Sequence, residues 1–261
     1  MIDIRLMGSV DLVSADRPQV QLVMRRSKRL ALVAYLAAAR PHGFHRRDAL
    51  LALFWPDLDA SHARNALRQA VHFLRDALGH DALLARGDDL ALDPRHVRSD
   101  VAEFERRVAA GDFESALVLY RGAFLHGLHV SRAPEFEHWL DQERERLRRQ
   151  AVEVALALAE RDETAGRPLD AVRWATRAVE FGPFDEQAVR CLIRALDRSG
   201  DRSAAVHAYE QFAERLRRTL ELEPAPETRV LVASVRDRET AVPHAARAPA
   251  VADTPAGSPR G

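Results

Sequence analysis

Six polar side chains between Arg64 and Arg75 have the types and spacing needed to read a nucleic acid. At about 100° per residue, one face of a helix predicted over residues 59–79 carries Arg64, Asn65, Arg68, Gln69, His72 and Arg75. Arginine bonds to guanine and to phosphate, and asparagine and glutamine bond to adenine. The opposite face is apolar and consists of Ala63, Leu67, Ala70, Val71, Leu74 and Leu78. Taken alone, the segment fits either a recognition helix or a solvated amphipathic helix with ordinary surface charge.

The neighbouring segments favour the recognition helix. Residues 27–39 predict a helix with Ser27 as its N-cap. Residues 45–54 predict a second short helix, which Pro56 stops. Residues 82–93 contain two short apolar runs joined by Arg-Gly-Asp-Asp, the pattern of a hairpin. Three helices followed by a hairpin is the order of a winged helix-turn-helix, whose third helix enters the major groove.

This order assigns roles to three further arginines. Arg86 in the hairpin is expected to meet the adjacent minor groove or backbone, and Arg46 and Arg47 are candidate phosphate contacts near the start of the second helix. Arg75 is expected to point toward a phosphate. For Arg64 an alternative stays open, in which it pairs on the protein surface with an acidic residue at position 57 or 59.

Alternating residues ahead of these helices predict a small sheet. The pattern occurs in residues 2–6 and again near residues 20–23, with Gly8 and Pro18 as turn residues between them. We expect two to four short strands there, as in the effector domains of response regulators.

A repeat organises the second half of the chain. Gly166 and Gly200 lie 34 residues apart, which is the tetratricopeptide period, and each opens a pattern of small and aromatic residues. The first unit continues with Ala171, Ala175 and Ala178, the second with Ala205, Tyr209 and Phe212, and a third match upstream has Gly111, Ala116, Tyr120 and Ala123. With a loop over residues 122–132 and a long helix over residues 133–160, this pattern predicts an α-solenoid.

The charge balance and the motifs of the chain restrict the classes of function that it can have. Residues 1–97 carry 14 Arg and Lys against 11 Asp and no Glu, a bias of about +3 that the rest of the chain offsets, because the totals are 39 and 39. This is a weak basic bias for a nucleic-acid binder.

The single cysteine, Cys191, excludes an internal disulfide, and the chain lacks the phosphate-loop, zinc-protease and nucleophile-elbow motifs. We therefore predict no enzyme, no cofactor and no metal site.

A series of motifs resembles one family of regulators. In chain order the motifs are Phe54-Trp55-Pro56, Ala63 to Arg68, Leu74 to Gly79, Asp100 to Glu105, Trp139-Leu140 with Glu143 to Leu147, and Glu223 to Thr228. Together they resemble the Streptomyces antibiotic regulatory protein family, in which an OmpR-type winged helix is joined to a tetratricopeptide-like bacterial transcriptional activator domain.

The resemblance implies an activator that binds direct repeats of double-stranded DNA near promoters and engages RNA polymerase subunits, with a homodimer on DNA as a further arrangement. Two positions depart from the family pattern. Leu90 stands where the wing often has an aromatic residue, and His72-Phe73 replaces a polar and basic pair, so that Phe73 is expected to pack rather than contact DNA.

These observations predict a mainly α-helical protein with an N-terminal winged helix-turn-helix, a small β-sheet and a wing hairpin, followed by a tetratricopeptide-like α-solenoid. The expected divisions are a DNA-binding domain over residues 1–97, an activator domain over residues 98–240 and a disordered tail over residues 241–261. The predicted function is sequence-specific transcription regulation in the cytoplasm, without a membrane segment. The alternative is an interaction scaffold whose winged helix serves as a docking domain.

Overall fold

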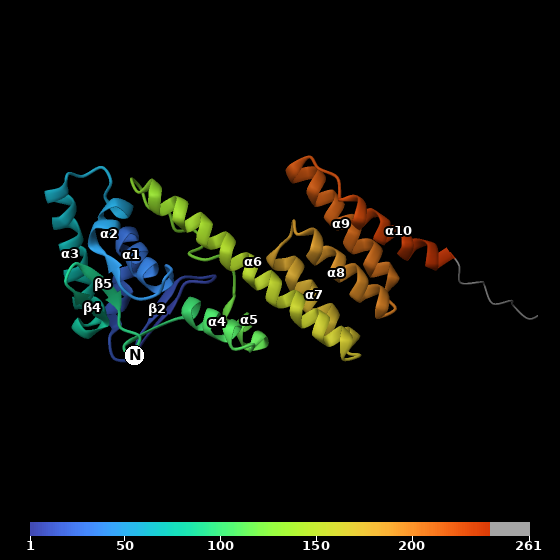
Figure 1. The fold of residues 1–261 in the computed structure, drawn as a ribbon, viewed down its shortest axis with the longest axis horizontal. Helices are drawn as coiled ribbons and strands as arrows, with labels where there is room; N and C mark the ends of the chain where they lie inside the picture. The colour runs from blue at the N-terminus through green and yellow to red at the C-terminus, as the bar shows by residue number, and fades with distance from the viewer. Residues whose placement is uncertain (241–261) are drawn as a thin grey trace, which may run out of the picture.

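The computed structural model describes residues 1–240, with side chains through residue 237. It forms an elongated molecule with α3 near one end and α7–α10 toward the other (Figure 1). The predicted tail over residues 241–261 lies outside the described residues. The strands are β1 (Ile2–Arg5), β2 (Asp11–Val13), β3 (His45–Arg46), β4 (Leu83–Arg86), β5 (Asp89–Leu92) and β6 (Val97–Ser99).

The helices confirm the mainly α-helical prediction. Those of the N-terminal part are η1 (Pro18–Arg25), α1 (Ser27–Ala38), α2 (Arg47–Phe54), α3 (Ala60–Leu78) and η2 (His80–Ala82). Those of the C-terminal part are α4 (Asp100–Ala109), α5 (Phe113–Leu119), α6 (Pro134–Thr164), α7 (Pro168–Phe181), α8 (Glu186–Arg198), α9 (Arg202–Leu220) and α10 (Pro226–Thr240).

The first sheet has the strand order β2-β1-β6 and corrects one expectation. β1 pairs with β2 on one edge and with β6 on the other, while residues 20–23, predicted as a strand, lie in the 3-10 helix η1. Val20 and Val23 are three residues apart and both buried, which suits the three-residue turn of a 3-10 helix.

The predicted N-cap of α1 is also corrected. Arg26, and not Ser27, occupies that position, and no side chain caps the helix.

The wing sheet contains the predicted hairpin and one strand more. β4 and β5 pair antiparallel, with Leu83 opposite Leu92 and Arg86 opposite Asp89. The free edge of β5 pairs with β3, so His45 and Arg46 form a strand rather than the start of the second helix. This pairing satisfies backbone groups that a two-stranded hairpin leaves open.

The predicted repeat appears as three helix pairs with the same turn. The pairs α4/α5, α6/α7 and α8/α9 pack side by side. Gly166 and Gly200 have φ of 72° and 90° in these turns, a left-handed backbone that glycine adopts without steric cost. In each turn the residue after the glycine donates its N–H to a carbonyl five residues back. Ala116, Ala171 and Ala205, five residues after the glycines, are all buried, which lets the paired helices approach closely.

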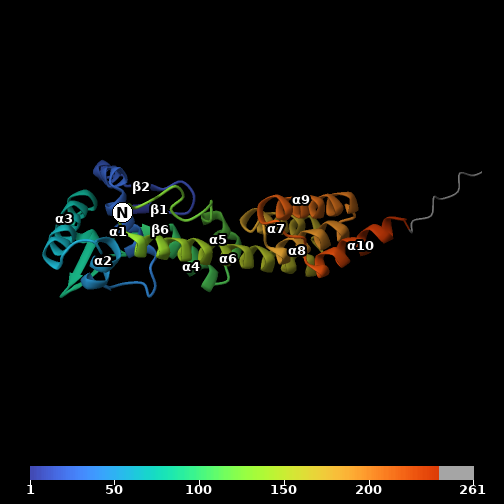
Figure 2. The ribbon, with the colours of Figure 1, turned by 90° about the horizontal axis from the view of Figure 1, so that it is seen from above.

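Helix α6 joins the solenoid to the winged helix. It runs diagonally from the side of α2 to α7 (Figure 1), and Figure 2 shows the same course from above. Near its start, the ring centroids of Phe136 and Phe54 lie 5.0 Å apart, and those of Trp139 and Tyr35 lie 4.8 Å apart. One hydrophobic core therefore continues from the N-terminal sheet into the first solenoid helices, and the predicted division after residue 97 falls within β6.

A buried carboxylate reinforces the same junction. Glu105 on α4 is 9% exposed. It binds Arg40 and His42, which follow α1, at 2.6 Å each, and Arg146 on α6 at 2.5 Å. Burial of the carboxyl raises its pKa, but the hydrogen bond from His42 and the charges of Arg146 and Arg40 outweigh burial, so the net pKa lies below the ordinary value.

We expect Glu105→Gln to reduce the free energy of unfolding at neutral pH by about 1–3 kcal/mol, because a charged acceptor of three donors is lost. Since the folded-state pKa is depressed, the stabilisation from Glu105 is present above the unfolded pKa and is lost as the pH falls through the folded one. Urea titrations between about pH 6 and about pH 3 should show a flatter stability profile for the variant. Parallel profiles for variant and wild type would contradict this role.

Candidate nucleic-acid interface

Helix α3 is fixed at its start by a cap and along its length by its apolar face. The Asp59 Oδ1 accepts hydrogen bonds from the backbone N–H of Ser61 at 3.0 Å and of His62 at 3.1 Å. The His62 bond, followed by those of Ser61, holds the pKa of Asp59 well below its usual range, so the cap stays ionised beside the positive helix end. All six residues of the predicted apolar face are buried: Ala63, Leu67, Ala70, Val71, Leu74 and Leu78.

The opposite face of α3 is open to solvent. Its exposed side chains are Arg64, Asn65, Arg68, Gln69 and His72. Within the described residues, Arg64 and Arg68 make no ion pair, so the structure does not contain the pairing of Arg64 with Asp57 or Asp59. His72 lies 3.5 Å from Asp76 and is 76% exposed. Five of the six predicted side chains thus share one accessible surface.

Two residues near the end of this face are placed differently. Arg75 is half-buried, and its Nε is enclosed without a hydrogen-bond partner in the described structure. Phe73 is half-buried beneath Arg29, whose guanidinium carbon lies 3.8 Å from the ring centroid. Phe73 therefore packs, as expected.

The stacking brings Arg29 of α1 beside α3. Sequence reasoning missed this residue, although its cluster with Arg25, Arg26 and Lys28 was the available signal.

The remaining three arginines lie in the wing sheet and at the start of α2, and both β4 of that sheet and α2 pack against α3. Arg46 on β3 and Arg86 on β4 both stand opposite Asp89 of β5, and directly opposed residues share one face of a sheet. The Arg86 guanidinium lies 4.3 Å from the Phe44 ring centroid, and Arg46 makes a long contact of 3.8 Å with Asp48. The backbone N–H of Arg47 bonds to the Asp88 carbonyl, and its side chain is half-buried.

The solenoid does not cover this surface. In both Figures 1 and 2, α3 lies near the opposite end of the molecule from α7–α10. Among the described elements, α3 packs against η1, α2, η2 and β4. The arginine-bearing face is therefore free to meet a duplex without displacement of the helical repeats.

Other kinds of site find little support in the described residues. No group of three His, Cys, Asp or Glu side chains in residues 1–240 could hold a metal ion. Over the same residues, no helix combines the length and apolar character needed to cross a bilayer.

Comparisons with known proteins agree with this architecture. A solved structure of Mycobacterium tuberculosis EmbR in complex with a low affinity phosphopeptide matches with a TM-score of 0.57 and 22% identity. The match covers 91% of this chain but 65% of that one, so the chain spans less than two thirds of that protein, and the likeness shows the fold alone. None of the curated proteins matches the chain.

The family model of the bacterial transcriptional activator domain matches residues 89–236, which is more than half of the chain. This match confirms the resemblance drawn from the motif series. The matched range contains the three glycine-turn helix pairs, from α4 to α9. The chain belongs to the bacterial transcriptional activator domain family of regulators.

Proposed function

We propose that this protein is a sequence-specific DNA-binding activator of transcription that inserts α3 into the major groove. The observation that carries the proposal is the exposed face of α3, which presents Arg64, Asn65, Arg68, Gln69 and His72 to solvent. Such side chains can form bidentate bonds to guanine and adenine edges. The capped start and buried apolar face hold the helix rigidly enough for that purpose.

The wing and the flanking arginines would position the helix. Arg86 and Arg46 share one face of the wing sheet and can reach the backbone beside the groove that α3 occupies. Arg47 and Arg75, both half-buried, and Arg29 on Phe73 are further phosphate contacts. The modest basic bias of residues 1–97 implies that affinity depends on several protomers binding side by side.

The proposal has four further parts: binding to direct repeats, a homodimer on DNA, contact with RNA polymerase subunits and a cytoplasmic location. They derive from the family to which the chain belongs and from the accessible surface of the solenoid. The division into a DNA-binding part over residues 1–97 and an activator part over residues 98–240 is proposed with them.

Selection from a random DNA pool tests the proposal with the purified full chain. We expect enrichment of two tandem half-sites spaced by about one helical turn or a multiple of it. A double variant, Arg64→Ala with Arg68→Ala, should lose the enrichment while keeping its fold by circular dichroism. Absence of enrichment by the wild-type protein, with retained capture of protein partners through residues 98–240, would instead identify an interaction scaffold.

Arg86→Ala should weaken binding to the preferred site and to random DNA alike, because a backbone contact carries no sequence information. The plot of log affinity against log salt concentration should become shallower by about 1, since one fewer counterion is released. Fluorescence anisotropy over a salt series measures both effects. A loss confined to the preferred site would show that Arg86 reads bases instead.

A further inference from the structure

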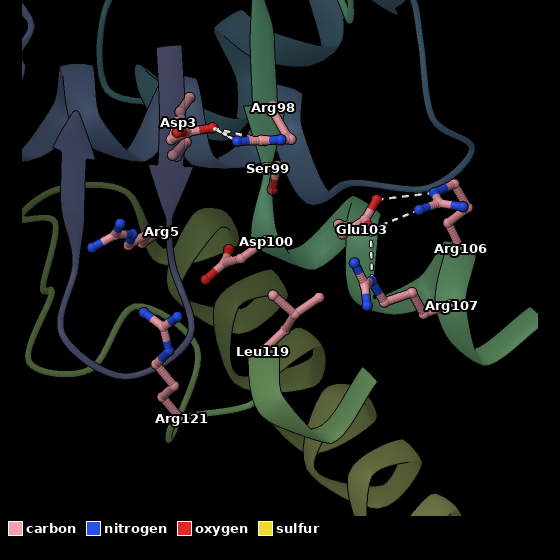
Figure 3. A pocket seen from close by; sticks show the side chains of 11 residues that line it. Asp3, Arg5, Arg98, Ser99, Asp100, Glu103, Arg106, Arg107, Leu119 and Arg121 are labelled. Atoms are coloured by element: carbon pink, nitrogen blue, oxygen red, sulfur yellow. Dashed lines mark hydrogen bonds and ion pairs between the residues drawn. The ribbon is translucent and has the colours of Figure 1, made fainter. Parts of the chain in front are cut away.

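A cavity of about 360 Å³ lies where the N-terminal sheet meets the first solenoid helices (Figure 3). Its walls come from β1, from the junction of β6 and α4, and from the end of α5 with the segment after it. This volume is within the range of small-molecule sites. The lining contains none of the nine residues first predicted to contact DNA.

The cavity is positively charged overall. Its lining holds five arginines against three carboxylates. Two of the carboxylates are already neutralised at its rim: Asp3 binds Arg98 at 2.7 Å, and Glu103 binds both Arg106 and Arg107 at 2.6 Å. The hydrogen bonds from Arg106 and Arg107 lower the pKa of Glu103 to about 2, so Glu103 is ionised at neutral pH.

The third carboxylate is turned toward the backbone. The Asp100 oxygens accept hydrogen bonds from the backbone N–H of Leu6 at 2.9 Å and of Met7 at 3.1 Å. Burial raises the pKa of Asp100, and the backbone hydrogen bonds from Met7 and Leu6, followed by the charge of Arg121, partly oppose the rise. Because its oxygens accept these backbone hydrogen bonds, Asp100 fixes the chain at the end of β1. It forms no ion pair with the arginines of the cavity in the described structure, and these can therefore bind another anion.

Two arginines in the cavity wall are exposed to solvent, and neither is bonded to another side chain within residues 1–237. Arg5 from β1 and Arg121 from the segment after α5 both line the cavity, and within the described residues neither guanidinium makes a hydrogen bond or an ion pair. In Figure 3, Arg121 lies below Arg5 in the left half of the view, and Leu119 lies to the right of Arg121 and below Asp100. A guanidinium presents a planar fork of donors that matches the two oxygens of a carboxylate or phosphate.

We propose that this cavity binds a small organic anion, whose phosphate or carboxylate group lies between Arg5 and Arg121 and whose carbon skeleton packs on Leu119. The anion supplies a charged acceptor to two guanidinium groups that are otherwise open to solvent. Such a ligand would contact β1 of the winged helix and the segment after α5 at once. The inference is independent of the proposed DNA binding.

Calorimetric titration of the full chain tests this site, with inorganic pyrophosphate and citrate as probes in separate arms. We expect at least one probe to bind with a stoichiometry of one, and the stronger arm identifies the anion class. The double variant Arg5→Gln with Arg121→Gln should weaken that binding by about tenfold or more, because two charge-assisted hydrogen-bond donors are lost. A matched control, Arg25→Gln with Arg26→Gln, removes two exposed arginines outside the cavity and should keep wild-type affinity.

A second measurement uses the wild-type chain, so that it does not depend on the folding of a variant. Phenylglyoxal modifies accessible guanidinium groups, and mass spectrometry should show that the binding probe protects Arg5 and Arg121 but not Arg25. Three results would overturn the proposal: no binding of either probe, equal weakening in both double variants, or labelling of Arg5 and Arg121 unchanged by the probe. Because DNA is absent from both experiments, such a failure leaves the proposed DNA binding untouched.

Discussion

Arg68→Ala should weaken binding to the selected DNA site by roughly 10- to 100-fold, while binding to random DNA changes far less. A base-reading arginine contributes about 1–3 kcal/mol of discrimination, and Arg68 is exposed on α3 without an ion-pair partner in the described residues. Because no contact within the fold is lost, the stability of the protein should stay unchanged. Fluorescence anisotropy with the two DNAs, at one fixed salt concentration, measures the difference.

Arg218→Ala is a matched control for this variant. Arg218 is also exposed on a helix, in the last turn of α9, but the solenoid places it far from α3. We expect wild-type affinity for both DNAs. Equal losses on the selected site and on random DNA for Arg68→Ala would show that this residue holds phosphate and does not read a base.

Phe136→Ala should lower the free energy of unfolding by about 3–5 kcal/mol, as is usual when a buried aromatic side chain is truncated. Phe136 is fully buried at the start of α6, and its ring packs against Phe54 of the winged helix and Trp139 of its own helix. Truncation of Phe136 would therefore leave an empty space at the junction of the winged helix and the solenoid. Urea unfolding followed by far-ultraviolet circular dichroism measures the loss.

The same variant tests whether the junction unfolds as one unit. Trp55 reports on the winged helix and Trp174 on α7, when each is kept as the single tryptophan and the others are replaced by phenylalanine. Because one core continues across the junction, both fluorescence midpoints should fall together. Phe184→Ala, at a side chain that is 40% exposed, should cost less than about 1 kcal/mol. A fall of the Trp174 midpoint alone would show that the winged helix unfolds independently.

Features set by short-range periodicity could be read from the sequence. The apolar stripe of α3 and the hairpin of β4 and β5 depend on residues within about one or two turns of one another, and both were predicted. The capping role of Asp59 is of the same local kind but was not predicted. The solenoid turns are of the same kind, because Gly166 and Gly200 supply a backbone conformation that their neighbours cannot. The exposure of Arg64 and Arg68 followed from the helix period alone.

Other features depend on which segments meet in space. Residues 20–23 have a plausible strand pattern, but β2 and β6 already occupy both edges of β1, so this segment became a 3-10 helix. His45 and Arg46 have helix-compatible neighbours, but the open edge of β5 drew them into a strand. The intrinsic preference of these residues for one secondary structure over the other is small. Pairing with a distant strand contributes more free energy than that difference.

The exposed polar face of the third helix, the wing hairpin and the repeated helix pair are encoded in the spacing of nearby residues. The stacking of Arg29 beside α3, the ties from Glu105 to α6 and to the segment after α1, and the shared cavity of Arg5 and Arg121 became visible only in the packed fold. Some of these residues, such as Arg5 and Arg121, are more than a hundred positions apart in the chain. Their meeting depends on how whole elements pack, which no local pattern of side chains records.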